Sequence, residues 1–129
     1  MPHLTLEYSA NLSPAAASDQ LFARLHALLA EVGGIRLANC KSRARELSRC
    51  FVAAGSSDAG FVHLDVRFME GRTPEVKQRL GWRLLEALRQ AYGADERAVQ
   101  ITVEIRDIAK ADYFKYPEGT LSPSGAQSQ

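Results

Sequence analysis

The chain is poor in cysteine and has almost no net charge. Its 129 residues include two cysteines, Cys40 and Cys50, which do not form a CxxC pair. This spacing is typical of reduced thiols in a cytoplasmic protein rather than of a disulfide framework. The formal net charge of +1 creates no global field that would attract nucleic acid or a membrane surface, so we expect neither as a partner.

Long apolar runs are also missing. No stretch is long and apolar enough to span a bilayer, and the first residues lack the basic and apolar regions of a secretory signal. A hydrophobic content of 46% and a charged content of 24% are ordinary for a soluble globular protein. We therefore expect a single domain over residues 1–121, followed by a Ser/Gly/Gln-rich tail at 122–129 that the composition predicts to be disordered.

What the chain does contain is an internal repeat. When the sequence is shifted against itself by 60 residues, His3 falls on His63 and no gap is needed. Further matches lie at equivalent places in the two halves: Leu4 with Leu64, Leu6 with Val66, Tyr8 with Phe68, and Leu25 with Leu85. We therefore predict two pseudo-repeats, at about residues 2–54 and 61–106.

Each half has the pattern of a strand, a helix and a second strand. Alternating apolar residues predict strands at 3–8, 62–68 and 99–105. An apolar stripe at helical spacing follows each first strand, and Ser13-Pro14 or Thr73-Pro74 suits its cap and first helical position. The remaining strand falls within residues 39–54, which are less regular and more polar.

These patterns define the expected fold class, α/β (α+β): a tandem βαβ-βαβ arrangement with a four-stranded sheet and both helices on one face. Parallel pairing within each unit follows from right-handed crossovers. The other face of the sheet has no helix left to cover it. We expect identical subunits to cover apolar groups there, which makes a homo-oligomer the expected assembly.

The two halves differ at their second strands. At the offset of 60 residues, an apolar row falls on a largely basic one: Val99, Ile101, Val103 and Ile105 on Asn39, Lys41, Arg43 and Arg45. In an extended segment the basic side chains project on the same side, and arginine binds carboxylates through a bidentate fork. The row indicates a carboxylate-binding surface, or alternatively a solvated edge strand whose charges prevent aggregation.

A further cation precedes the second helix. Arg72 stands directly before Thr73, the predicted N-cap. Backbone N–H groups and the helix dipole favour an anion at that place, so Arg72 is a candidate anion-binding residue. The alternative is a loop arginine in water.

The amino terminus supplies a candidate base. Methionine aminopeptidase removes Met1 when a small residue follows, so we expect the mature chain to begin with the secondary amine of Pro2. An α-amino group titrates at about 7.7–8.0, and burial or nearby cations lower that pKa. A base that is neutral near pH 7 suits proton-transfer catalysis. The alternative is that Met-Pro is simply a stable N-terminus.

Four segments of the chain are similar to those of one known family. They are residues 2–12, Phe61-Val62-His63-Leu64, Gly71-Arg72 and Tyr113-Phe114-Lys115. Together they resemble the 5-carboxymethyl-2-hydroxymuconate Δ-isomerases, the fused double-βαβ branch of the tautomerase superfamily. The resemblance covers about residues 2–121.

The resemblance implies a trimer with active sites near the subunit boundaries and no metal or organic cofactor. It implies isomerisation of an unsaturated 2-hydroxy polycarboxylate, 5-carboxymethyl-2-hydroxymuconate, to its 2-oxo-3-ene isomer during bacterial degradation of homoprotocatechuate. Carried onto this sequence, the catalytic base is Pro2 and the substrate-binding arginine before the second helix is Arg72. The family's strand arginine falls on Lys41, which keeps the charge but loses the fork, and Arg43 matches a further basic position.

Several other residues have simpler interpretations. His3 and His63 are repeat mates without a third ligand at metal spacing, so we interpret them as structural or interface residues. Cys50 has no histidine partner in local sequence, so a catalytic thiol is not expected. Core packing is expected for Trp82. The late aromatic residues are assigned to core or trimer packing, or to a pocket wall: Tyr113, Phe114 and Tyr116.

Two kinds of rival function remain open. The same scaffold could carry a tautomerase of phenylpyruvate-like enols, or a hydrating dehalogenase whose water-activating acid would be Glu7 or Glu104. It could also be a non-catalytic trimeric binding protein. If Met1 were retained, it would block the Pro2 amine and so favour the non-catalytic binding protein.

Overall fold

The computed structural model describes residues 1–93 and 98–116. The predicted tail at 122–129 and the end of the expected domain, 117–121, lie outside the described residues. The elements follow one another as β1 (His3–Ser9), η1 (Pro14–Ala16), α1 (Asp19–Gly33), η2 (Leu37–Asn39), β2 (Lys41–Leu47), β3 (Ala59–Met69), α2 (Pro74–Tyr92), β4 (Ala98–Ile108) and η3 (Lys110–Asp112). No helix in the described ranges has an apolar stretch long enough to cross a membrane.

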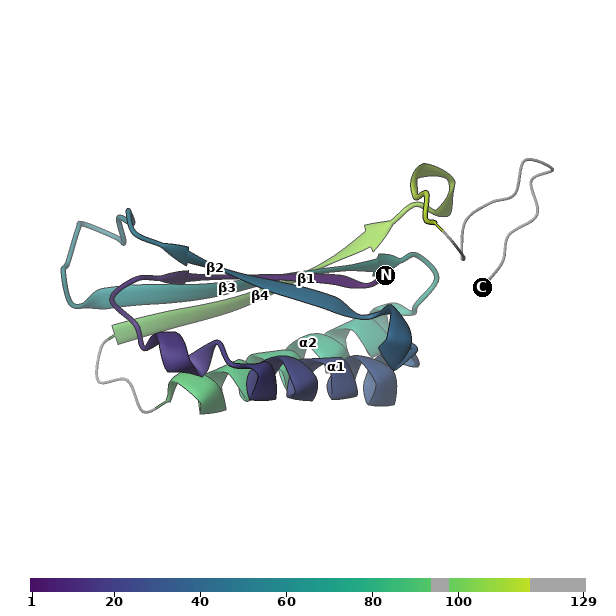
Figure 1. The fold of residues 1–129 in the computed structure, drawn as a ribbon, viewed down its shortest axis with the longest axis horizontal. Coiled ribbons are helices and arrows are strands. Elements are labelled where there is room, and N and C mark those ends of the chain that lie inside the picture. Colours follow the sequence, from purple (N-terminus) through teal and green to yellow (C-terminus); the bar gives the residue numbers. More distant parts are fainter. Residues whose placement is uncertain (94–97, 117–129) are drawn as a thin grey trace.

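The four strands form one mixed sheet in the order β2-β1-β3-β4. Strand β1 pairs parallel to β2, β3 pairs parallel to β4, and the two halves join through the antiparallel pair β1–β3. Both helices lie beneath the same face of this sheet (Figure 1). The expected βαβ-βαβ fold, with two helices on one face, is therefore confirmed.

The core lies between this face and the helices. Alternate residues of the two central strands are fully buried there: Leu4, Leu6, Val62, Leu64 and Val66. The helices contribute leucines at helical spacing: Leu21, Leu25, Leu28 and Leu29 from α1, and Leu80, Leu84 and Leu88 from α2. Strand alternation and the helical stripe thus predicted the core correctly, because each element has one apolar side to bury.

The start of the first helix differs from the prediction. Residues Pro14–Ala16 form a separate 3₁₀ turn, and the Ser13 side chain makes no capping hydrogen bond. The α-helix begins at Asp19, where the Ser18 hydroxyl accepts a hydrogen bond from the Leu21 N–H at 3.2 Å. The second helix begins as predicted, because the Thr73 hydroxyl accepts from the Val76 N–H and Pro74 is the first helical residue. The predicted cap, Ser13, therefore precedes only the 3₁₀ turn, and Ser18 caps the α-helix.

The gapless alignment of the two halves is wrong by one residue at the second strands. His3 pairs with Lys41, but its repeat mate His63 pairs with Thr102, not with Ile101. The true counterparts of the basic row are therefore polar residues of β4: Thr102 for Lys41, Glu104 for Arg43 and Arg106 for Arg45. A shift of one residue moves a side chain to the opposite face of a sheet, so the supposed change from an apolar to a basic row compared two different faces.

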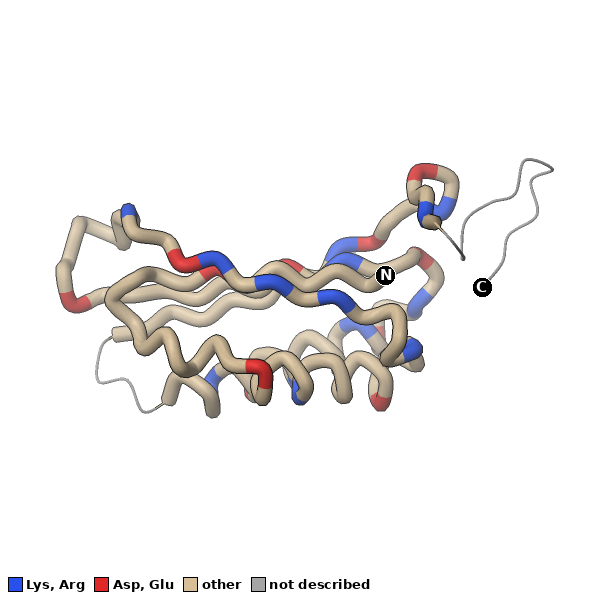
Figure 2. The backbone as a smooth tube through the Cα atoms, viewed as in Figure 1, with Lys and Arg blue, Asp and Glu red and all other residues tan. Residues whose placement is uncertain are grey.

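The open face of the sheet is polar, which corrects a second expectation. The residues that alternate with the core on β1 and β3 include His3, Thr5, Glu7, His63 and Asp65, and the basic row of β2 lies beside them. Figure 2 shows that row as blue segments along β2. The apolar side of the two central strands is already covered by the helices, so apolar burial is not the reason for covering the open face.

Trp82 is not a core residue. Its side chain is 65% exposed on α2, beside half-buried isoleucines of β4. In the 60-residue shift Trp82 falls on Phe22, which is itself only partly buried and packs against the core. Trp82 lies in a helix as predicted, but at the flank of the apolar stripe of α2 rather than at its centre.

Candidate active site

Segments distant in sequence meet where β1 begins. Lys41, the first residue of β2, pairs with His3, and Arg67 near the end of β3 pairs with the same residue from the other side. The loop that follows β3 carries Arg72, so Arg72 is brought to this end of the sheet as well. Figure 1 shows the N-terminus at this end, near the C-terminal end of α1. The topology therefore gathers all four predicted site residues at one end of the sheet.

The amino terminus lies in a partly buried, positively charged setting. The Pro2 side chain is fully buried, and its carbonyl accepts a hydrogen bond from the Lys41 N–H at 3.1 Å. Burial, and then the neighbouring Lys41 and Lys115, lower the pKa of the Met1 α-amino group from 8.0 to about 5. An amine at this place is neutral at pH 7 and can accept a proton.

Cys40 lies beside the same amine, but its thiol is not an activated nucleophile. Burial raises the pKa of Cys40, against the opposing effect of the amino terminus and Lys41. A thiol with a raised pKa is protonated at neutral pH and reacts slowly. Both cysteines are free, and the available chemistry at this end of the sheet is that of the amine and the cations.

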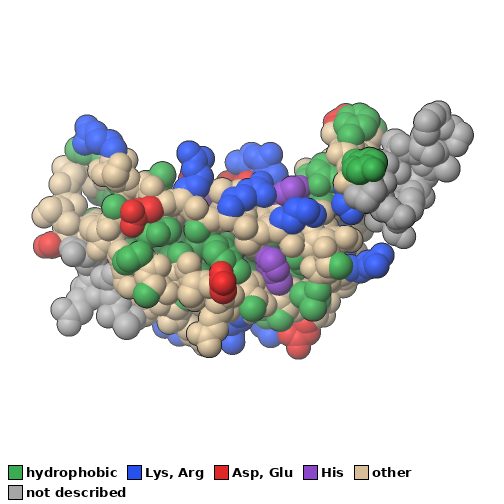
Figure 3. Space-filling model, viewed as in Figure 1, with side chains coloured by type: hydrophobic (Ala, Val, Ile, Leu, Met, Phe, Trp, Pro, Cys, Tyr) green, Lys and Arg blue, Asp and Glu red, His purple; other side chains and the backbone are tan. Residues whose placement is uncertain are grey.

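His3 links Arg43 to Tyr113 across the open face. Arg43 Nη1 lies 3.0 Å from His3 Nδ1, and Tyr113 Oη lies 2.8 Å from His3 Nε2. Burial, and then the charge of Arg43, lower the pKa of His3, which favours the neutral imidazole. These three residues line one end of a groove of about 660 Å³ on the open face. In Figure 3, Lys and Arg side chains gather along the upper edge of the molecule.

Arg72 has a structural role that the sequence did not indicate. Its Nε donates a hydrogen bond to the carbonyl of Gly33, the last residue of α1, at 2.7 Å. Its guanidinium carbon also lies 5.2 Å from the centroid of the Phe68 ring. A cation at the C-terminus of a helix is favoured by the helix dipole. Arg72 is not among the described residues that line the groove, so it stands apart from Arg43.

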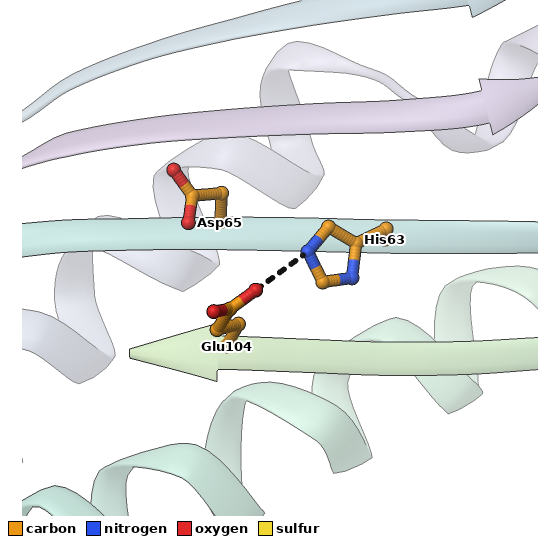
Figure 4. Close-up of side chains that lie close together, drawn as sticks. All are labelled: His63, Asp65 and Glu104. Atoms are coloured by element: carbon orange, nitrogen blue, oxygen red, sulfur yellow. Dashed lines mark ion pairs between the residues drawn. The ribbon is translucent and has the colours of Figure 1, made fainter. Parts of the chain in front are cut away.

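One cluster on the open face has side chains of the kind that bind metals. Single ligand atoms of His63, Asp65 and Glu104 all lie within 4.8 Å of one another (Figure 4). Two guanidinium groups already bind these carboxylates: Arg67 and Arg106 lie 3.0 and 3.1 Å from Asp65, and Arg106 also lies 3.1 Å from Glu104. Because these cations would repel a metal ion, we interpret the cluster as an ion-pair network.

Comparison with known proteins gives the family. A family model described as 5-carboxymethyl-2-hydroxymuconate isomerase matches residues 2–118. The chain belongs to this isomerase family. The 5-carboxymethyl-2-hydroxymuconate Delta-isomerase of Escherichia coli is 30% identical over 117 residues, which are 89% of this chain and 93% of that protein.

Two solved structures support the same assignment. A 5-carboxymethyl-2-hydroxymuconate isomerase from Deinococcus radiodurans R1 matches with a TM-score of 0.79 at 31% identity, over 88% of this chain and 87% of that one. The Q0 fused 4-OT, a symmetric trimer, matches with a TM-score of 0.74 at 27% identity, over 95% of this chain and 97% of that one. The expected family, the tautomerase-like fold and the isomerase class are confirmed.

The residues that follow β4 lie closer to the candidate site than the sequence alone indicated. For Tyr113, the expected alternative of a pocket wall agrees with the structure, because Tyr113 contacts His3 and lines the groove. Lys115 lies close enough to lower the pKa of the amino terminus. Neighbouring Phe114 and Tyr116 are 77% and 93% exposed, so they are not core residues. The segment Tyr113-Phe114-Lys115 contributes to the family resemblance, but no pattern within it shows that it returns to β1.

The structural role of Arg72 leads to a prediction about stability. Arg72→Ala removes a charge-assisted hydrogen bond and a cation–π contact, so we expect the free energy of unfolding in urea to fall by about 1–3 kcal/mol. The matched control is Arg79→Ala, which removes an exposed arginine of α2 and should change stability by less than about 0.5 kcal/mol. Equal stability of the two variants would show that Arg72 does not stabilise the end of α1.

Proposed function

We propose that this chain isomerises 5-carboxymethyl-2-hydroxymuconate to its 2-oxo-3-ene isomer by proton transfer through the amine of Pro2, exposed when Met1 is removed. The observation that carries this proposal is the setting of the amino terminus. Burial, Lys41 and Lys115 together keep the Met1 α-amino group neutral at pH 7, and the Pro2 nitrogen lies one residue further into the same setting. A neutral amine among cations suits a base that acts on a polyanionic substrate.

The reaction needs one base and no external redox partner. The substrate dienol loses its proton from the 2-hydroxyl oxygen, and a proton is added to a distant carbon as the double bonds shift. The amine accepts the first proton and returns one to carbon, so atoms and charge balance over the cycle. Cations near the 2-oxygen stabilise the negative charge that develops there, and fixed carboxylates hold the carbon chain within reach of the amine.

Three cations are available to hold the substrate carboxylates. Arg43 has His3 as its hydrogen-bond partner and no carboxylate partner among the described residues. Arg72 uses its Nε for the Gly33 carbonyl, which leaves the two terminal nitrogens of its guanidinium for a ligand. Lys41 donates to the Asn39 carbonyl at 3.1 Å, and the Lys41 ammonium has further protons to donate. Arg43 can thus supply the fork that Lys41 lacks at the family's strand position.

A hydrating dehalogenase is less well supported than the isomerase. Its water-activating acid would be Glu7 or Glu104. Glu7 lies 3.7 Å from Arg45, and Glu104 interacts with both His63 and Arg106. Carboxylates paired in this way already have partners other than a water molecule. The two free thiols are compatible with a cytoplasmic enzyme.

We also propose a homotrimer. A relative of similar fold, the Q0 fused 4-OT, is a symmetric trimer. In this chain both edge strands of the sheet, β2 and β4, have one side without a partner strand in the described residues. The exposed Trp82 and the half-buried Ile101, Val103 and Ile105 add an apolar surface beside β4. If three subunits met through these edge strands, the polar open face of each sheet would point toward the interior of the ring.

Activity should depend on an unblocked Pro2 amine. We expect protein whose intact mass shows loss of Met1 to be active, and protein that retains Met1 to be nearly inactive, because an amide nitrogen is not a base. Pro2→Ala keeps a primary amine and should retain weak activity. The measurement is turnover of 5-carboxymethyl-2-hydroxymuconate by samples of verified mass. Full activity in protein that carries Met1 would disprove the role of Pro2.

The pH dependence of kcat/KM should change when a cation near the amine is removed. Lys41→Ala removes a positive charge that disfavours the ammonium form, so the pKa of the amine rises and the acidic limb of the profile moves to higher pH. We expect the pKa to rise only part of the way to its usual value, because burial contributes more to the lowered pKa than Lys41 does. Arg45→Ala, on the same face of β2 but paired with Glu7, is the control and should not move the limb. A limb that stays in place or moves to lower pH in Lys41→Ala contradicts this account of the amine.

The assembly can be measured directly. Light scattering at micromolar concentration should give three times the mass of one chain. Trp82→Asp should lower that mass or weaken the assembly, because it places a charge in the proposed apolar contact, whereas Arg79→Asp on the same helix should not. A single-chain mass with full activity would contradict both the trimer and any site at its boundaries.

A further inference from the structure

The contacts of His3 determine which of its nitrogens carries the proton. A guanidinium group donates hydrogen bonds and accepts none. Arg43 Nη1, 3.0 Å from His3 Nδ1, must therefore donate to a lone pair on Nδ1. A neutral imidazole with an acceptor at Nδ1 has its proton at Nε2. His3 accordingly donates from Nε2 to the Tyr113 hydroxyl oxygen, 2.8 Å away.

This arrangement leaves the proton of the Tyr113 hydroxyl without a partner. The phenolic oxygen accepts from His3, so its own O–H must point elsewhere. No acceptor for this proton lies in residues 1–93 and 98–116 other than the His3 nitrogen that already donates. The Tyr113 side chain is half-buried and lines the groove of the open face. The hydroxyl is thus a donor at the wall of a groove that arginines and carboxylates line together.

The hydroxyl is bonded to the residue that follows the proposed base. This residue is His3, which follows Pro2 directly in the chain. Two residues after Tyr113, Lys115 is near enough to lower the pKa of the amino terminus. Arg43 and Tyr113 flank the same imidazole ring, so a charged donor and a neutral donor face the groove on the two sides of one residue.

We infer that the Tyr113 hydroxyl donates a hydrogen bond to a carboxylate of the isomerase substrate, and that His3 is a positioning residue that orients this hydroxyl. The inference rests on the proposed function and extends it to the segment after β4. Arg43 attracts the same carboxylate or its neighbour through its positive charge, and the Tyr113 hydrogen bond determines how that carboxylate is oriented. A neutral donor of fixed orientation selects where a carboxylate lies without adding another charge to the site.

The main test is Tyr113→Phe, which removes one oxygen and keeps the ring. A hydrogen bond to a charged group contributes roughly 1.5–3 kcal/mol, so kcat/KM should fall by about 10- to 100-fold, mainly through a higher KM, because a carboxylate contact is made in ground state and transition state alike. Tyr116→Phe is the matched control: the same change, three residues on, in a side chain that is 93% exposed. Equal kcat/KM in wild type and Tyr113→Phe would overturn the inference.

A binding measurement separates this inference from the proposed function. Muconate has two carboxylates but lacks the 2-hydroxyl group, so it cannot undergo the reaction. Calorimetry should show muconate binding weakened about tenfold or more in Tyr113→Phe and unchanged in Tyr116→Phe. If wild type fails to turn over the isomerase substrate but this pattern holds, the proposed reaction is wrong and the Tyr113 donor stands. If wild type turns it over while muconate binds all three proteins equally, the reaction stands and the Tyr113 donor is wrong.

The role of His3 has its own readouts. Nitrogen-15 NMR of the imidazole should show a neutral ring protonated at Nε2 at pH 7; protonation at Nδ1 or at both nitrogens would overturn the orientation argument. Because His3 acts through Tyr113, His3→Ala should raise KM in the wild-type background and change it little in Tyr113→Phe. His3→Gln, which can restore an N–H donor, should recover part of the loss. Additive effects in the double variant would show that His3 does not act through Tyr113.

Discussion

The antiparallel register of β1 with β3 is the constraint on which the rest of the molecule depends. Leu4 faces Val66 and Leu6 faces Leu64, so both central strands present their apolar residues to the same side. The helices can then cover one face, and every alternate residue is left on the other. Because side chains alternate strictly along a strand, burial on one face and polar chemistry on the opposite face have a single cause.

The two βαβ units share this plan but differ by one residue at the outer strands. The difference is small in sequence and large in effect, since it decides which side chains lie toward the helices. In the second unit, Ile101, Val103 and Ile105 lie toward α2 and support the core. In the first unit the positions that face the helices are smaller or polar, and the basic residues Lys41 and Arg43 lie on the open face. The outer strand of the second unit is thus apolar on the helix face, and the outer strand of the first unit is basic on the open face.

Electrostatics at the amino terminus depends on chain segments that are remote in sequence. Burial of the terminus is the larger cause of the lowered pKa, and Lys41 and Lys115 add to it from β2 and from the segment after β4. Arg72 lies at the same end of the sheet, yet part of its guanidinium is engaged in holding the end of α1. If Arg72 binds substrate as proposed, its bond to Gly33 would couple the end of α1 to the geometry of the site.

The sequence by itself determined the fold class, the repeat, the core leucines and the list of site candidates, because periodicity, capping and family-specific segments are local properties of the chain. It did not determine the start of α1, which is capped by Ser18 and not by Ser13. It did not determine the strand offset either, because a one-residue shift leaves the alternation of both strands intact. The exposure of Trp82, the engagement of Arg72 with Gly33 and the bond of Tyr113 to His3 were decided only by tertiary structure. Each of these depends on which segments meet in space, and residues as far apart as His3 and Tyr113 show no common pattern in the chain until β4 brings its following segment back beside β1.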